Sequence, residues 1–160
     1  GRVLFQGVTV DDNKSLHRLR CGVGLVLQNS DDQLFSPTVL EDVAFGPLNL
    51  GLKKKEAKVR AMETLASLGI ESFADRPTHC LSGGEKKMVS IASVLAMHPK
   101  ALLLDEPTAF LDDASRDRIT SLLHGLKIAQ IIVSHDKDFL KQTATSFISI
   151  RNGVISECSL

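Results

Sequence analysis

The stretch ALLLDEPTAFLD, residues 101–112, contains the pattern that decides the fold. A short apolar run, 101–104, is followed at once by two acids, Asp105 and Glu106, and then by Pro107. A short apolar run bounded by such residues is typical of a buried strand in a parallel sheet. Adjacent strand residues point to opposite faces, so the two carboxylates at this strand tip are placed to serve different groups.

Two other apolar runs also end in polar side chains. VGLVLQ, 23–28, predicts a buried strand that ends at Gln28. IIVSHD, 131–136, continues a strand predicted over 130–133 into Ser134 and His135. Ligands of open α/β sheets bind at the carboxyl ends of strands, so these three tips together predict a binding site.

The order of elements after residue 96 predicts the fold class. Helices predicted over 113–123 and 136–143 alternate with the strands, and strands over 146–150 and 154–157 form a hairpin at Asn152-Gly153. This order predicts an α/β fold with a mostly parallel sheet flanked by helices.

The part before residue 97 is interpreted as largely helical. Residues 2–10 predict a strand with a turn at Gly7, whereas 34–96 contain only helix-like segments and predict an inserted helical lobe. The chain would then be one domain, 1–160, in which residues 1–33 and 97–160 form the α/β core.

Three helices are expected within this lobe. Thr38 and Glu41 have capping-box spacing for a short helix that Gly46-Pro47 would end. The helix predicted over 53–68 ends at a C-cap, Gly69. Its apolar face is predicted to contain Val59, Met62, Leu65 and Ala66.

The third helix, predicted over 82–96, begins with LSGGEKK, 81–87. Ser82 and Glu85 have the spacing of a capping box, which explains both residues by structure alone. Gly83 and Gly84 in the first turn each cost about 1 kcal/mol of helix stability. Glycines at a helix start also let backbone N–H groups approach a phosphate, which offers a functional explanation.

The composition restricts the classes of partner. The 160 residues carry 19 Lys plus Arg and 19 Asp plus Glu. A net charge of zero argues against a nucleic-acid surface. The three cysteines, Cys21, Cys80 and Cys158, lack the spacing of a zinc site and predict no disulfide framework. No apolar run approaches the ~20 residues of a membrane-spanning helix, and no signal peptide is visible, so we expect a cytosolic chain.

Taken together, LSGGE, LLLDEPTAFLD and IIVSHD, in this order, resemble the nucleotide-binding domain of ABC transporters. The stretch 27–52, with DDQLF and EDVAFGPLNLGL, further resembles the energy-coupling-factor subgroup, whose members drive the uptake of cobalt, nickel or vitamins. The resemblance implies a P-loop NTPase-like fold, the cofactors ATP and Mg²⁺, and an ATPase activity that powers import.

The resemblance also implies a role for each matching residue. Asp105 would hold Mg²⁺, and Gln28 would contact both Mg²⁺ and the attacking water and sense the coupling segment. Glu106 would polarise that water, and His135 would contact the γ-phosphate. Asp112 would bridge two ATPase subunits. The signature residues would bind the ATP of the opposite subunit, and they are Ser82, Gly83, Gly84 and Glu85.

Two departures from the family pattern stand out. Met88 replaces an arginine that many members have in the signature helix. None of the 11 glycines is followed by Lys, so the P-loop motif G-x-x-x-x-G-K-[ST] is absent from the sequence. We expect that an N-terminal piece carrying it has been lost, that the chain alone is inactive, and that VGLVL and ALLL expose apolar surface. A chain that naturally has no P-loop is the alternative.

The expected partners are a second ABC ATPase subunit, homo- or heterodimeric, and membrane subunits that couple transport and bind the substrate. The chain would lie peripherally on the cytoplasmic face of the membrane. The apolar stretch 34–52 would contact the membrane partner, or else fill the core of the lobe. Two other functions remain open. One is a non-hydrolytic module that lends its signature to another subunit's ATP; the less favoured one is a soluble ABC protein of DNA repair or translation.

Overall fold

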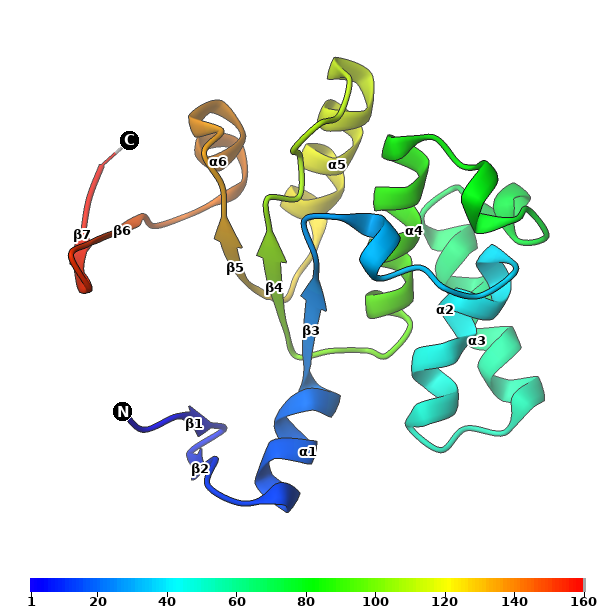
Figure 1. Cartoon of the computed structure of the whole chain (residues 1–160), viewed down its shortest axis with the longest axis horizontal. Coiled ribbons are helices and arrows are strands. Elements are labelled where there is room, and N and C mark those ends of the chain that lie inside the picture. The colour runs from blue at the N-terminus through cyan, green and yellow to red at the C-terminus, as the bar shows by residue number, and fades with distance from the viewer. Residues whose placement is uncertain (160) are drawn as a thin grey trace.

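The computed structural model describes residues 1–159 and has a three-stranded parallel sheet at its centre (Figure 1). The strand order in this sheet is β3-β4-β5. The remaining strands form two separate antiparallel pairs, β1-β2 and β6-β7. The strands are β1 (Leu4–Phe5), β2 (Val8–Thr9), β3 (Val23–Val26), β4 (Ala101–Asp105), β5 (Ala129–Val133), β6 (Ile148–Arg151) and β7 (Val154–Glu157).

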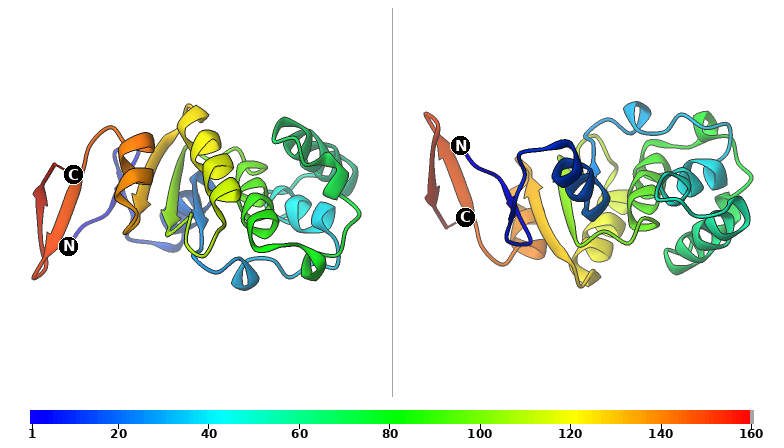
Figure 2. Two further views of the ribbon diagram at one scale, coloured as in Figure 1. Left: turned by 90° about the horizontal axis from the view of Figure 1, so that it is seen from above. Right: turned by 90° about the horizontal axis from the view of Figure 1, so that it is seen from below.

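The molecule is elongated, with α2 and α3 at the end opposite the β6–β7 hairpin and the other helices beside the central sheet (Figures 1 and 2). The α-helices are α1 (Asn13–Gly22), α2 (Val39–Asn49), α3 (Lys54–Ser67), α4 (Gly83–Leu95), α5 (Asp113–Gly125) and α6 (Lys137–Thr143). Short 3₁₀ helices lie at η1 (Ser30–Asp32), η2 (Glu71–Phe73) and η3 (Thr78–Cys80). The predicted α/β class with a parallel sheet is confirmed.

One face of the central sheet is buried and the other is open within residues 1–159. Val26, Leu102 and Leu104 are at most 1% exposed and belong to the same core as the buried side chains of α4 and α5. On the opposite face, Leu25 and Ile131 are 50% and 61% exposed. The expected exposure is therefore confirmed for Leu25 of VGLVL but not for ALLL, in which Ala101 and Leu103 are half-buried and Leu102 and Leu104 are buried.

The predicted end of α2 at Gly46-Pro47 is wrong, since the helix continues to Asn49. Pro47 lies in the last turn, where Leu50 N still donates to Gly46 O at 3.1 Å. Gly46 is needed for packing: a Cβ there would lie 2.5 Å from Cγ of Met97. The predicted cap is confirmed, because the Thr38 side chain accepts from the backbone N–H of Glu41.

The predicted apolar face of α3 is confirmed only for Leu65, which is fully buried. Val59 and Met62 are 51% and 37% exposed, and Ala66 is exposed as well. The buried face consists of Ala57, Ala61 and Leu65, at i, i+4 and i+8. Small alanines let α3 approach its neighbours closely. The predicted terminus holds, because Gly69 has φ +65° and its N–H donates to Ala66 O at 3.0 Å.

Three further differences lie in the first 33 residues. The strand predicted over 2–10 is a two-stranded hairpin that turns at Gln6-Gly7. The strand predicted to end at Gln28 ends at Val26. Helix α1 was not predicted, and none of its residues is buried; its start is fixed by Asp12, whose carboxylate accepts from Ser15 N at 2.6 Å.

The first turn of α4 packs against the first turn of α5. A Cβ on Gly84 would lie 2.1 Å from Oγ and 2.6 Å from Cβ of Ser115. The neighbouring Gly83 has no atom within 4 Å of its hypothetical Cβ. Packing therefore accounts for Gly84 but leaves Gly83 unexplained by structure.

Because of this difference, adding one methyl group at Gly84 or at Gly83 should change the free energy of unfolding in opposite directions. Gly84→Ala should lower the free energy of unfolding by about 1–3 kcal/mol, because Ser115 must shift and its bonds to Asp112 are strained. Gly83→Ala should be neutral or up to about 1 kcal/mol stabilising, because Ala favours helix. Urea unfolding of the two variants measures both values, and equal effects would contradict the packing argument.

Candidate functional site at the strand ends

The register of the sheet brings the three predicted strand tips to one edge. Val26 pairs with Leu104, and Asp105 pairs with Val133, in parallel strands. The segments that follow these residues therefore leave the sheet side by side, which confirms the expected arrangement of the tips but not the roles of their residues.

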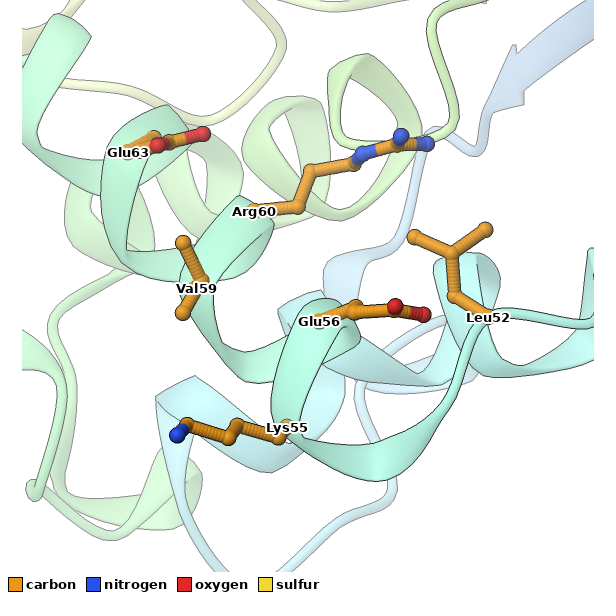
Figure 3. Close-up of a pocket in the computed structure, with 6 residues that line it drawn as sticks. All are labelled: Leu52, Lys55, Glu56, Val59, Arg60 and Glu63. Carbon is orange, nitrogen blue, oxygen red and sulfur yellow. The ribbon is translucent and has the colours of Figure 1, made fainter.

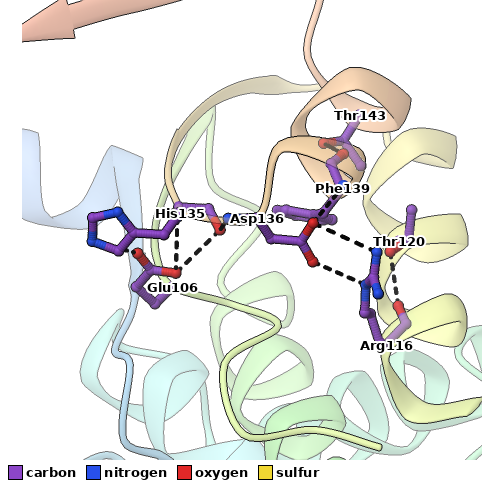
Figure 4. A network of polar contacts seen from close by, with 8 residues as sticks. Glu106, Arg116, Thr120, His135, Asp136, Phe139 and Thr143 are labelled. Atoms are coloured by element: carbon purple, nitrogen blue, oxygen red, sulfur yellow. Dashed lines mark hydrogen bonds and ion pairs between the residues drawn. The ribbon is translucent and has the colours of Figure 1, made fainter. Parts of the chain in front are cut away.

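Glu106 is held by the loop that follows β5 (Figure 4). Its Oε2 accepts from Ser134 Oγ at 3.1 Å and from His135 N at 3.4 Å. Its backbone has φ +42° and its N–H donates to Val133 O at 2.9 Å. The side chain is 14% exposed, and its Oε1 is buried without a hydrogen-bond partner. A buried carboxylate oxygen of this kind is available to accept from a small donor such as water.

His135 differs from Glu106 in exposure. Its side chain is fully exposed, and Nε2 lies 3.5 Å from Oε1 of Glu106. The loop beneath it is fixed by Asp136, which accepts from Phe139 N and pairs with Arg116 of α5, with Nε to Oδ2 at 2.9 Å. The imidazole therefore projects from an anchored loop.

Asp105 and Gln28 are exposed residues on adjacent strand exits. Residues 1–159 contain no group of three His, Cys, Asp or Glu side chains that would form a protein-only metal cage. Mg²⁺ in nucleotide sites is commonly held by one or two side chains, with phosphates and waters as the other ligands. An exposed carboxylate and an exposed amide oxygen at one sheet edge fit that donor set.

The signature segment begins α4 with a complete capping box. Ser82 N donates to Glu85 Oε2 at 2.7 Å, and Glu85 N donates to Ser82 Oγ at 3.3 Å. The other oxygen of Glu85 pairs with Arg76 Nη1 at 2.7 Å. The Arg76 guanidinium, with the Ser82 N–H, lowers the pKa of Glu85 from 4.5 to about 2.

A hollow of about 500 Å³ lies between this helix start and the segment after β3. Gln28, Gly83 and the segment 109–111 contribute to its wall. Phe110 is 95% exposed and has φ +62°, a conformation that is costly for a residue with a Cβ. Gln28 and Gly83, which were predicted from separate motifs, therefore share one concave surface.

Asp112 caps α5, with Oδ1 accepting from Ser115 N at 2.9 Å and Oδ2 accepting from Ser115 Oγ at 2.8 Å. These bonds lower the pKa of its carboxyl group. Asp112 therefore serves as the N-cap of α5, and its predicted role in bridging two subunits stays a prediction.

The apolar stretch 34–52 divides between core and surface. Leu34, Val39 and Val43 are at most 9% exposed and fill the core. Phe35 and Phe45 are 65% and 44% exposed and pack edge to face, with ring centroids 4.7 Å apart. The core interpretation is thus confirmed for the buried residues of the stretch, while contact of the exposed ones with a membrane partner stays a prediction.

Another hollow, of about 440 Å³, lies on α3 away from the strand ends (Figure 3). Its wall consists of Leu52, Lys55, Glu56, Val59, Arg60 and Glu63. No residue of the predicted site takes part in it. Among residues 1–159, no helix is both long and apolar enough to cross a membrane.

The sequence placed Ser134 at a strand tip without giving it a role, and the structure shows that it holds Glu106. Three other residues that shape the site were not predicted: Arg76 holds Glu85, Phe110 protrudes beside the hollow, and Lys87 is buried beneath Gln28. The partners of Arg76 and Lys87 are distant in sequence or are backbone atoms, so no sequence motif indicates these contacts.

Comparison with known proteins gives a consistent result. The family model described as ABC transporter matches residues 1–109. The cobalt import ATP-binding protein CbiO of Rhodobacter capsulatus is 50% identical over 157 residues, covering 96% of this chain and 56% of that protein. The energy-coupling factor transporter ATP-binding protein EcfA of Methanocaldococcus jannaschii is 48% identical over 159 residues, covering 97% and 57%.

A solved structure shares the fold. CbiO1 from Clostridium perfringens, described as part of the ABC transporter complex cbiONQ, is 42% identical with a TM-score of 0.87. The match covers 98% of this chain and 64% of that one. The chain thus spans little more than half the length of the two curated relatives named above.

The Arg76–Glu85 pair predicts a pH dependence. Because the folded-state pKa of Glu85 is depressed from 4.5 to about 2, the stabilisation is complete above about pH 4.5. It is lost as the pH falls through 2, since the unfolded state binds the proton first. The difference in unfolding free energy between the natural protein and Glu85→Gln should therefore shrink between pH 4.5 and 2. Glu71→Gln, at an exposed residue of η2, is the control. A difference for Glu85→Gln that does not change with pH would contradict the assignment.

Proposed function

We propose, from the premise that this chain belongs to the ABC transporter family of ATP-binding domains, that it binds and hydrolyses ATP to drive an energy-coupling-factor importer of a metal ion or vitamin. The observation that carries the proposal is the half-satisfied Glu106 carboxylate, which Ser134 and the backbone of His135 hold by one oxygen only. Names of relatives such as CbiO and EcfA support the import function and the cobalt or related cargo.

In this function Glu106 positions the attacking water. Its Oε2 is fixed, so the free Oε1 has a defined direction and can accept a proton from water as the nucleophile forms. The φ of +42° at Glu106 turns the side chain out of the strand alternation and toward the next strand's loop. Strain of this kind is found at sites where geometry matters more than stability.

Asp105 and Gln28 would hold Mg²⁺, whose charge, when the ion is bound, neutralises the phosphate oxygens. His135, fully exposed on an anchored loop, would contact the γ-phosphate. Phosphoryl transfer depends on positioning and on charge neutralisation more than on covalent chemistry, and these residues offer both.

The signature residues would serve the nucleotide of a second ATPase subunit. The helix start at Ser82, Gly83 and Gly84 presents N–H groups at the positive end of the α4 dipole. Gly83 has open space above it, which a phosphate can approach. Glu85 would act through the cap that it completes, and Phe110 and Asp112 would lie at the subunit boundary.

A non-hydrolytic module that lends its signature to a partner is the second candidate. In it the helix start at Ser82 would serve the partner's nucleotide, and on either view we propose that residues 1–160 alone are inactive. The contacts of Glu106 favour the enzyme, because a module without hydrolysis has no use for a water-positioning carboxylate.

The test of hydrolysis is Glu106→Gln in the full-length protein. The amide keeps the shape and the metal ligand Asp105, but it loses the negative charge that polarises water. We expect ATP binding to persist while turnover falls about 100-fold or more. Phosphate release and nucleotide calorimetry measure the two effects. Asp117→Asn, on the exposed side of α5, is the matched control, and near-normal turnover by Glu106→Gln would refute the role.

The proposed membrane partner predicts a localised contact. Phe35→Cys and Phe45→Cys, in a protein whose three natural cysteines are replaced, should crosslink to a transmembrane subunit in the assembled importer. Val59→Cys on α3, which is 51% exposed, is the control and should not. Crosslinks from Val59→Cys with none from the two phenylalanine positions would place the contact elsewhere on the lobe.

A further inference from the structure

Helix α4 is fastened by side chains to the segment 27–33, which leads from β3 through Gln28 into η1. Lys86 Nζ pairs with Asp31 Oδ1 at 2.6 Å. Gln33 Nε2 donates to Ser90 O at 2.8 Å and to Ser93 Oγ at 3.2 Å. Lys87, which lies between Lys86 and Ser90 in α4, contacts the first two residues of the segment.

Lys87 is the unusual member of this set. It is only 2% exposed, and its Nζ donates to Leu27 O and to Gln28 O, each at 2.8 Å. Burial lowers the pKa of Lys87, and the nearby carboxylate of Asp105 opposes that shift. A buried cation carries a large desolvation cost, so packing alone would favour an apolar side chain at this position.

The two carbonyl groups explain why a cation is present. The β3 ladder ends with Val26, so Leu27 O and Gln28 O lie beyond the sheet pairing. Carbonyl groups near the core need donors, and Lys87 supplies N–H groups to both at once. Leu27 N is satisfied separately, because it donates to Gln33 Oε1 at 3.1 Å. The turn at Gln28 therefore depends on α4 for its shape.

We infer that Lys87 is a positioning residue that fixes the backbone of Gln28 to the signature helix, so that Gln28 and Gly83 move as one body. Lys87 and Gly83 lie one helical turn apart on α4, and both line the hollow that contains Gln28. A shift of α4 when a nucleotide meets Gly83 is then transmitted to Gln28 by two hydrogen bonds. The role that this inference gives to Gln28 rests on the proposed function.

The first test measures the clamp without any catalytic assay. Lys87→Met, in the full-length protein, removes both donors and keeps the volume. Amide exchange at Gln33 and Leu34, whose N–H groups bond to Ser30 O at 3.1 and 3.0 Å, should quicken by about tenfold or more. Exchange in α2 and α3 should stay unchanged. Unchanged exchange at Gln33 and Leu34 would overturn the inference, as would an equal increase over the whole lobe.

Two comparison variants make this result specific. Lys86→Met breaks a pair whose Asp31 side chain is 66% exposed, and it should quicken exchange by less than about threefold. Gln33→Ala removes the other, part-buried contacts with α4 and should loosen η1 as Lys87→Met does, which keeps the inference testable if Lys87→Met does not fold. Loosening by Lys86→Met equal to that by Lys87→Met would show that no single buried clamp exists.

The second test separates positioning from general stability. In Lys87→Met of the full-length protein, kcat for ATP should fall about tenfold or more while KM stays within about twofold, because the clamp orients Gln28 without contacting the nucleotide. A rise in KM with kcat unchanged would overturn the positioning role. If the natural full-length protein hydrolyses no ATP, the proposed function fails, and the exchange measurement still decides whether Lys87 holds the turn.

Discussion

Parallel pairing of β4 with both β3 and β5 is the constraint on which the rest of the molecule depends. It places Gln28, Asp105–Glu106 and Ser134–His135 at the same edge of the sheet, although they are far apart in the sequence. Each strand contributes one polar turn, and the strand spacing of about 4.8 Å sets how close those turns lie. Glu106 bonds to Ser134 only because β5 is the immediate neighbour of β4.

Helix α4 connects that edge to the rest of the chain. It packs on the sheet through Val94, which faces Gly24 of β3, and its N-terminal turn is fixed by the Ser82–Glu85 cap and the Arg76 pair. Arg76 also accepts a backbone bond from Val39 at the start of α2. Through Arg76, the start of α4 is thus connected to the start of α2, next to the surface that carries Phe35 and Phe45. One turn later, α4 is connected to Gln28 through Lys87. The same contacts that stabilise the lobe therefore give a continuous route between these surfaces.

The sequence predicted what short-range rules govern. The strand predicted over 101–104, the Ser82–Glu85 cap, the Gly69 terminus and the Asn152-Gly153 hairpin each follow from a few neighbouring residues, and each is present. The errors arise where tertiary packing decides. Gly46 serves contact with Met97 and not helix termination, and α3 buries its alanines in preference to Val59. The role of Lys87 could not be predicted, because a hydrogen bond from a side chain to a backbone carbonyl 59 or 60 residues away has no signature in the local sequence.

The connection from β4 to α5 shows why the site is less regular than the fold that carries it. Within residues 106–110, both Glu106 and Phe110 adopt positive φ, which costs of order 1 kcal/mol or more for a residue with a Cβ. Burial does not offset this cost at Phe110, since its ring is 95% exposed in this chain. Glu106 keeps one buried oxygen without a partner, a further cost. Three local costs in one short connection, on an otherwise well-packed sheet, are those expected of a segment whose geometry is set by a ligand and a neighbouring subunit. The buried core beneath, from Leu102 to Leu123, supplies the stability that tolerates them.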